Sequence, residues 1–194
     1  EVTGVDKDTR IVTMVNNGKE YHTEAKYIIF AVGRFGSRFF SRWCHEHDIE
    51  LKNNQVDIGV RVELPAIIWD NFSKKIYEPK IWYRSKRYGD TTRMFCFNER
   101  GGVVTENTDG VLTVNGHSYR DAARKTENSN FALLSTIRFT QPFNDPISYA
   151  RNVASLANLI AGGGVLVQRL GDLENGRRTE YKRLAQSSTR PTMQ

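Results

Sequence analysis

The fold prediction rests on residues 27–37, which read Tyr27-Ile28-Ile29-Phe30-Ala31-Val32-Gly33-Arg34-Phe35-Gly36-Ser37. The first six are an apolar run without polar alternation, which is typical of a strand covered on both faces in a parallel sheet. Two glycines then provide a turn, and from Phe35 to His47 apolar side chains recur with the spacing of an amphipathic helix. We therefore predict a buried strand, a glycine turn and a helix. Open α/β sheets bind ligands at such turns.

The residues before this stretch predict a small β-meander. Its strands are expected at Val2–Val5, Ile11–Val15 and Glu20–Thr23. Between the last two lies Asn17-Gly18, and this pair suits a tight hairpin turn because both central residues of the turn need a positive φ.

From residue 55 onward the pattern is different and rich in strands. Val56–Leu64 alternates strictly between apolar and other residues, which predicts a half-buried strand that Pro65 ends. A helical turn is expected within Ala66–Phe72. Further strands are predicted at Lys80–Arg84, Thr92–Phe97, Gly102–Glu106, Val111–Val114 and Phe131–Phe139.

One long helix is predicted near the end of the chain. Asp145-Pro146 begins it, because Asp can accept hydrogen bonds from free N–H groups and Pro suits the first helical turn. Gly162-Gly163-Gly164 ends it. The polar, basic tail of residues 171–194 is expected to be extended and partly disordered. The predicted helix has a core stripe of Tyr149, Val153, Leu156, Ala157 and Ile160.

Composition narrows the class of protein. The chain has 194 residues, with 28 Lys or Arg against 22 Asp or Glu and a formal net charge of +6. At roughly 150 residues per domain, the length predicts one to two domains, and the change of pattern places a boundary near Asn53-Asn54. With 39% hydrophobic and 26% charged residues, long disorder is excluded. No apolar run approaches the length of about 18 residues that indicates a membrane span, so we expect no membrane partner.

The two cysteines and the start of the chain also carry expectations. Cys44 and Cys96 cannot form a disulfide framework, so a reducing cytoplasm is the expected location. The first residues have neither an initiator Met nor the pattern of a signal peptide. We therefore expect this sequence to be a fragment of a larger protein.

The turn at Gly33–Ser37 is the strongest chemical candidate. Its glycines would let a phosphate or a flavin edge approach the backbone, and the following helix adds a partial positive charge at its N-terminus. A plain connection between strand and helix is the alternative. The chain lacks both G-x-G-x-x-G and the P-loop pattern, so the main phosphate-binding loop of any nucleotide site would lie outside it.

Each of the other polar motifs has two interpretations. Cys44-His45-Glu46-His47 resembles a metal cluster, but Cys44 and His47 share one helix face and His45 does not, so we predict core packing and no metal. His117 follows a turn and is a candidate acid or base, with an exposed loop histidine as the alternative. Arg61 and Glu63 would line a cleft or pair across the sheet.

Two basic segments suit anionic partners. Arg84-Lys86-Arg87 lies beside Tyr83 and Tyr88, and Arg177-Arg178 lies near Lys182-Arg183. Pairing of phosphates with cations and of bases with aromatic rings would allow contact with nucleic acid. Because no known nucleic-acid-binding signature is present, a solvated surface or a cleft for an anionic substrate is favoured.

Taken in order, several segments carry a resemblance to a known family. Besides the meander they are Lys26–Ser37, Val56–Pro65, Arg93–Asn98, Gly101–Val104, Val114–Ser118, Asn130–Leu134 and Val167–Asp172. With these segments the chain resembles the middle portion of the uncharacterised FAD-dependent dehydrogenases, also called NAD(FAD)-utilising dehydrogenases.

The resemblance implies a fold class and a cofactor. Residues 1–54 would be a slice of a Rossmann-type FAD-binding domain, and residues 55–194 an inserted, β-rich α+β domain on the substrate side. It also implies that Val32, Gly33 and Arg34 contact FAD, although Val32 stands where the common pattern has Thr. The glycine fingerprint and the closing segment of the FAD site are not in this sequence. We therefore expect it to need the remainder of the FAD-binding domain and to be inactive alone.

The expected function is that of a cytoplasmic FAD-dependent oxidoreductase, a dehydrogenase in its complete form. NAD(P) or a small unsaturated or carbonyl compound would be the hydride partner. A basic cleft favours an anionic small-molecule substrate, and Arg61 and His117 are the candidate catalytic residues; they come from the pattern of residues and not from the resemblance. The alternative is a basic, β-rich module for nucleic-acid binding or assembly, without catalysis.

Overall fold

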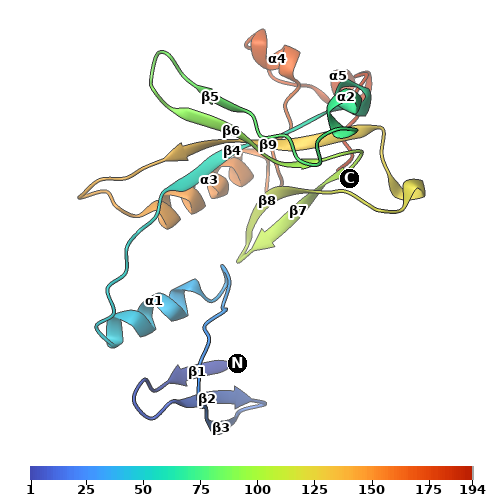
Figure 1. Cartoon of the computed structure of the whole chain (residues 1–194). Coiled ribbons are helices and arrows are strands. Elements are labelled where there is room, and N and C mark those ends of the chain that lie inside the picture. Colours follow the sequence, from blue (N-terminus) through green and yellow to red (C-terminus); the bar gives the residue numbers. More distant parts are fainter. Residues whose placement is uncertain (194) are drawn as a thin grey trace. The chain divides into compact units, whose positions relative to one another are not determined.

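The computed structural model describes residues 1–193, which divide into two compact units, Glu1–Lys52 and Asn53–Gln194. The division falls beside the boundary predicted near Asn53-Asn54. Over the described residues the structure is mixed α+β, with antiparallel sheets and five α-helices (Figure 1). We describe each unit by itself.

Unit 1 begins with the predicted meander. Strands β1 (Val2–Val5), β2 (Ile11–Asn16) and β3 (Lys19–Glu24) form an antiparallel sheet in the order β1-β2-β3. The predicted hairpin turn is confirmed: Asn17 and Gly18 have φ angles of 50° and 75°. Both angles are positive, as the tight turn requires.

The helix α1 (Ser37–Glu46) confirms the predicted amphipathic helix, and it packs through aromatic side chains. The ring of Phe30 lies 5.0 Å from that of Phe40 and 4.6 Å from that of Trp43. The indole N–H of Trp43 donates a hydrogen bond of 2.6 Å to the carbonyl of Val5, which ties α1 to β1. Cys44, a residue of α1, is fully buried.

The predicted buried strand at residues 27–32 is wrong. The residues lie outside any strand, and among the described residues none pairs with them. Ile28 and Phe30 are half-buried toward α1, whereas Tyr27 and Ile29 on the alternate positions are 78% and 88% exposed. An apolar run becomes a buried strand only when neighbouring strands satisfy its backbone and cover its second face. In the described residues of unit 1, α1 covers one face of the run 27–32, and the other face stays exposed.

Unit 2 is built on an antiparallel sheet with the order β4-β9-β6-β5. A separate hairpin pairs β7 with β8. The predicted strands are confirmed with shifted ends: β4 (Val56–Pro65), β5 (Trp82–Arg84), β6 (Thr91–Asn98), β7 (Gly102–Thr108), β8 (Val111–His117) and β9 (Asn128–Ile137).

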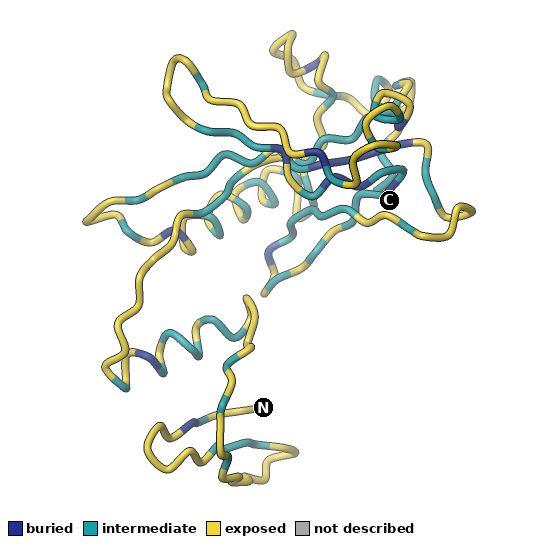
Figure 2. The backbone as a smooth tube through the Cα atoms, in the orientation of Figure 1, coloured by how far each residue is buried: buried dark blue, intermediate teal, exposed yellow. Residues whose placement is uncertain are grey.

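The core of unit 2 lies against the middle of this sheet (Figure 2). Met94, Phe97 and Phe131 are buried together, and Trp69 packs on them with its ring 5.4 Å from Phe97 and 5.6 Å from Phe131. Trp69 comes from the predicted helical turn, which contains the 3₁₀ helix η1 (Ala66–Ile68) and the short helix α2 (Asp70–Ser73). A second 3₁₀ helix, η2, spans Ala122–Arg124.

The long helix α3 (Pro146–Ile160) begins as predicted, because the carboxylate of Asp145 accepts a 3.0 Å hydrogen bond from the Ser148 N–H. It ends at Ile160, and Gly162 and Gly163, both with positive φ, follow its C-cap Ala161. The predicted core stripe is wrong. The helix is held to β8 by the amide of Asn158, which bonds the N–H and the carbonyl of Leu112, and this polar attachment leaves the stripe outside. Most of its side chains are exposed: Tyr149, Val153, Leu156 and Ile160.

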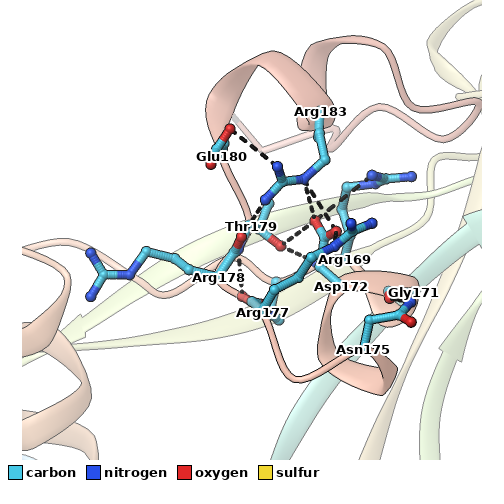
Figure 3. A network of polar contacts seen from close by, with 10 residues as sticks. Arg169, Gly171, Asp172, Asn175, Arg177, Arg178, Thr179, Glu180 and Arg183 are labelled. Carbon is cyan, nitrogen blue, oxygen red and sulfur yellow. Dashed lines mark hydrogen bonds and ion pairs between the residues drawn. The ribbon is translucent and has the colours of Figure 1, made fainter.

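The tail differs from the extended segment that was predicted. It contains two short helices, α4 (Leu170–Glu174) and α5 (Tyr181–Ala185), and Gln194 lies outside the described residues. Asp172, a residue of α4, is fully buried (Figure 3). Its carboxylate accepts hydrogen bonds from Arg177 Nε at 2.8 Å and the Thr179 hydroxyl at 3.1 Å, and Arg183 Nε lies at 3.2 Å. These contacts join residues up to eleven positions apart, which local periodicity does not reveal.

Candidate functional site

The predicted cofactor turn in unit 1 is an exposed connection into α1. Gly33 has a φ of +61°, and a Cβ built on it would meet no atom within 4 Å. At Gly36 a Cβ would lie 2.5 Å from the Cβ of Val32, so the tight approach there requires glycine. The Gly36 N–H donates to the Val32 carbonyl at 3.1 Å, which closes the turn.

The same turn offers backbone donors to an anion. No side chain caps the N-terminus of α1, because its N-cap residue is Gly36; the hydroxyl of the next residue, Ser37, donates to the Arg34 carbonyl at 2.8 Å. The first N–H groups of a helix have no partner within the helix and favour negative charge. Val32, Gly33 and Arg34 are exposed around them. The N–H groups of Gly36 and Ser37 already donate to the Val32 and Arg34 carbonyls, so the open space over Gly33 and the remaining N–H groups of the first helical turn are what the site offers to an anion.

A second polar site lies in unit 2, around Arg61. We call it the Arg61 cluster and define it as Arg61, Cys96, Asn98, Asn115 and Asn130. The guanidinium of Arg61 donates from Nε to Asn130 Oδ1 at 2.8 Å and from Nη2 to the Cys96 carbonyl at 2.8 Å. Its Nη2 also lies 3.8 Å from Cys96 Sγ. Asn130 is fully buried and donates to the Gly101 carbonyl at 3.0 Å, so its amide fixes the guanidinium in place.

A β-bulge brings Cys96 to Arg61. In the pairing of β6 with β9, Phe95 lies opposite Ala132 and Asn98 opposite Asn130, so β6 contains one extra residue. Cys96 sits in this bulge with a φ of +50°, an uncommon value for a residue with a side chain. The bulge turns its carbonyl toward Arg61, and Asn98 Nδ2 donates to the same carbonyl at 2.9 Å.

The β7–β8 hairpin closes over the cluster at Gly116. A Cβ on Gly116 would lie 2.1 Å from both Arg61 Nη2 and Asn130 Oδ1. Only glycine therefore allows the hairpin to approach the guanidinium this closely. Beside it, the amide of Asn115 donates to Glu106 at 2.7 Å and accepts from the Gly116 N–H at 2.8 Å.

The charge of Arg61 has no direct counter-charge among residues 1–193. Arg61 is half-buried, and no carboxylate within residues 1–193 forms an ion pair with it; its hydrogen-bond partners are the Asn130 amide and the carbonyl and thiol of Cys96. Burial of a cation without an anion is costly, so an incoming carboxylate or phosphate would be stabilised here. The arrangement can bind and orient an anion.

His117 is not part of this cluster. It follows Gly116 on β8, where it pairs with Gly102 and is exposed. Because successive side chains of a strand point to opposite faces, the imidazole points away from the face that Gly116 presents to Arg61. The structure therefore does not bring the two predicted catalytic residues together.

Glu63 has a partner of another kind. Its carboxylate accepts hydrogen bonds from the Thr192 hydroxyl at 2.5 Å and from Asn128 Nδ2 at 3.0 Å. It thus attaches the tail to β4 and does not line the Arg61 cluster.

The motif Cys44-His45-Glu46-His47 packs through Cys44 and His47, as predicted. The ring of His47 stacks on Trp43 with centroids 4.5 Å apart, and its Nδ1 lies 2.8 Å from the Trp43 carbonyl. Cys44 and Cys96 are free thiols. Within the part of the chain that the structure describes, no three His, Cys, Asp or Glu side chains gather as a metal site would require.

Sequence reasoning missed Cys96, Asn98, Asn115 and Asn130 as members of a site. One signal was present: Asn130 stands directly before the predicted apolar strand Phe131–Phe139. A buried amide needs hydrogen-bond partners, so its position indicates a polar neighbour on an adjacent strand. The identity of that neighbour depends on strand register, which the sequence does not give.

Comparison with protein-family models and with characterised proteins finds no match for the chain. Among residues 1–193, no helix combines the length and the apolar character needed to cross a bilayer. We therefore infer function from the geometry of each unit.

Proposed function

We propose that the chain is part of a FAD-dependent oxidoreductase of the cytoplasm, in which unit 1 belongs to the flavin-binding domain. The observation that carries this proposal is the run 27–32. One face of the run packs on α1 through Phe30, while its backbone and its other face are open. A strand of a layered α/β sheet has this form before its neighbours pair with it. The remainder of the FAD-binding domain would supply those neighbours, in a Rossmann-type arrangement.

Val32, Gly33 and Arg34 would then lie beside the cofactor. In an α/β sheet the ligand binds where a strand ends and the next helix begins, and this turn occupies that position. Two observations support this placement of the cofactor: the open space over Gly33 and the absence of a side-chain cap at the start of α1. When bound, FAD would supply the hydride chemistry. The protein's own contribution here is backbone N–H groups that orient an anionic or polar edge.

Unit 2 would serve the substrate as an inserted domain. The guanidinium of Arg61 is fixed by Asn130 and by the bulge at Cys96, and in the described part of the chain no carboxylate pairs with it. A fixed cation of this kind recognises the carboxylate or phosphate of a small molecule. Its role would be to bind and orient. The hydride donor or acceptor in this proposal is NAD(P) or the anionic substrate itself, and His117 stays a candidate acid or base only if the substrate reaches its face of β8.

The test is flavin retention by the complete parent protein, purified without added cofactor. We expect a flavin absorbance spectrum at about one cofactor per chain. Gly33→Leu should abolish it, because the new side chain would fill the space over the turn. Gly18→Leu is the matched control: it lies in the same unit, has a φ of +75° and also has no atom within 4 Å of an added Cβ. A colourless parent that fails to take up FAD, or equal flavin content in both variants, would refute the proposal.

A further inference from the structure

A strongly basic, aromatic surface lies at one edge of unit 2. We call residues 80–95 the β5–β6 ribbon; they contain β5, β6 up to Phe95 and the turn between them. The ribbon has five Lys or Arg against one Asp, a formal charge of +4 in a chain of net charge +6. Strand β5 is the edge strand of the sheet in the described residues (Figure 1). The loop that connects β5 to β6 is exposed (Figure 2).

Cations and rings alternate along the ribbon. Lys80 Nζ lies 5.0 Å from the centroid of Phe95, and the Arg93 guanidinium lies 4.8 Å from Phe95 and 5.9 Å from Trp82. Trp82 pairs with Arg93 across the strands, which places both on one face. Each of the two cations is also held by a carboxylate: Lys80 by Glu78 at 2.8 Å and Arg93 by Asp57 at 2.6 Å.

The turn of the ribbon carries cations that are not held in this way. Arg84, Lys86 and Arg87 form no ion pair with a carboxylate in the described residues. The turn is nevertheless ordered, since the Ser85 N–H donates to the Asp90 carbonyl at 2.8 Å. Arg87 lies 5.1 Å from the ring of Tyr88. The turn thus presents three available cations next to an aromatic ring.

The rings on this surface are not core residues. Trp82 and Tyr83 are each 64% exposed and Tyr88 is 69% exposed. Large aromatic side chains that are exposed to water leave apolar area unburied. Several such side chains together with cations indicate an interaction surface. The surface offers flat apolar faces and positive charge within one short hairpin.

We propose that the β5–β6 ribbon binds single-stranded nucleic acid, with bases stacked on Trp82 and Tyr88 and phosphates bound by Arg84, Lys86 and Arg87. Charge complementarity and the exposed rings support this partner, because single strands present both an unpaired base face and a phosphate for every nucleotide. This inference goes beyond the proposed flavin chemistry and does not depend on it.

Other anionic partners fit the surface less well. In a duplex the base faces are already stacked, so the exposed rings would have no partner. Insertion into a lipid bilayer would carry the Arg93–Asp57 pair, which lies beside the rings, into an apolar medium at a high desolvation cost. An acidic peptide would neutralise the turn but would leave the ring faces unused.

The test measures anisotropy of a fluorescein-labelled oligothymidylate of about 12 nucleotides, titrated with the full chain. An abasic oligomer of equal length is the second probe. We expect the oligothymidylate to bind about tenfold tighter than the abasic oligomer, because stacking of one or two bases contributes that much. Affinity should fall with salt, by about 0.7 logarithmic units per phosphate contact for each tenfold increase.

Two sets of variants separate charge from stacking. Trp82→Ala with Tyr88→Ala should weaken oligothymidylate binding about tenfold or more and leave the salt slope unchanged. Arg84→Ala, Lys86→Ala and Arg87→Ala together should lower the slope by about 2. The matched control removes three exposed cations elsewhere: Lys19→Ala, Lys52→Ala and Arg178→Ala. That control should keep the slope of the unmodified chain.

Several outcomes would overturn the proposal. The proposal is wrong if the oligothymidylate and the abasic oligomer bind with equal affinity, or if the chain binds neither at low salt. It is also wrong if the control triple variant loses as much of the salt slope as the variant without Arg84, Lys86 and Arg87. Tighter binding to vesicles of phosphatidylcholine with phosphatidylserine than to the oligothymidylate would assign the surface to a membrane instead. Because flavin retention is measured separately with Gly33→Leu, failure here leaves the oxidoreductase proposal standing.

Discussion

Replacing Asn130 by Ala tests whether a buried amide holds the Arg61 cluster together. The side chain is fully buried, accepts from Arg61 Nε at 2.8 Å and donates to the Gly101 carbonyl at 3.0 Å. Loss of the hydrogen bond to the charged guanidinium costs about 1.5–3 kcal/mol, and loss of the neutral bond costs about 0.5–1.5 kcal/mol. We therefore expect Asn130→Ala to lower the free energy of unfolding by about 3 kcal/mol.

Urea denaturation followed by circular dichroism measures this change. Asn175→Ala is a matched control, because that amide also donates to a carbonyl, of Gly171 at 2.6 Å, but is exposed. We expect it to cost less than about 1 kcal/mol, since water replaces its partner. A change within about 0.5 kcal/mol for Asn130→Ala would refute the idea that the amide fixes Arg61.

Asn130→Asp separates the function of the cluster from its stability. A carboxylate at this position would retain the acceptor for Arg61 Nε and would neutralise the guanidinium at close range. Because a carboxylate cannot donate to the Gly101 carbonyl as the amide does, this variant should also lose stability, but unlike Asn130→Ala it should lose affinity for anionic ligands through charge neutralisation, measured by calorimetric titration with phosphate. Unchanged affinity for phosphate would show that Arg61 is not the anion-binding group.

Three further predictions concern single positions. Gly116→Ala should destabilise unit 2 by about 1–3 kcal/mol in urea denaturation, because the new methyl group would overlap Arg61 and Asn130; wild-type stability would contradict the close approach at Gly116. Burial raises the pKa of Asp57, but hydrogen bonds from Thr136 and Arg93 outweigh burial and hold that pKa below its usual value. The stability that Asp57 adds over Asp57→Asn should therefore be complete above the unfolded pKa of about 3.9 and disappear as the pH falls through the lower folded pKa; a pH-independent difference would refute this. Cys44→Ser should cost about 1–3 kcal/mol, because a hydroxyl would be buried in the apolar site under α1, and should leave metal content unchanged by atomic absorption; loss of stoichiometric zinc would overturn the packing interpretation.

The elements that could be predicted from the sequence are those with local signals. Asn17-Gly18 specifies its hairpin because the turn needs two positive φ angles, and the structure has both. The strict alternation of residues 56–64 predicts β4, and Pro65 is its last residue. Asp145 caps α3 as predicted. Each of these signals acts within a few residues, so no knowledge of the partner strand or helix is needed.

The misplaced elements depend on partners that are distant in sequence. The run 27–32 has the composition of a buried strand, but pairing requires a neighbour, and none of the described residues provides one. The exposed stripe of α3 has the periodicity of a core face, although the polar side chain of Asn158 attaches the helix to β8. Periodicity indicates which side chains share a face and does not indicate what covers that face.

The candidate site shows the same limit at the level of single residues. Arg61 could be chosen from the sequence because it interrupts an apolar strand, whereas Cys96 could not. Its positive φ arises from the one-residue bulge between the pairs Phe95–Ala132 and Asn98–Asn130. A bulge follows from the register of two strands more than thirty residues apart. Register is set by packing across the sheet and by turn geometry, and no motif within either strand encodes it.

Two arginines of the same sheet differ in whether a carboxylate neutralises their charge, and this difference determines which of them can bind an anion. Arg61 and Arg93 are both half-buried, and each extends from a strand paired with β9. The carboxylate of Asp57 binds the Arg93 guanidinium at 2.6 Å and neutralises its charge. The same guanidinium also lies over the rings of Trp82 and Phe95. Within the described residues, the hydrogen-bond partners of Arg61 are the Asn130 amide and the carbonyl and thiol of Cys96, all of them neutral groups. Since these neutral groups orient the guanidinium without cancelling its charge, Arg61 is the arginine of this pair that an anionic substrate would meet.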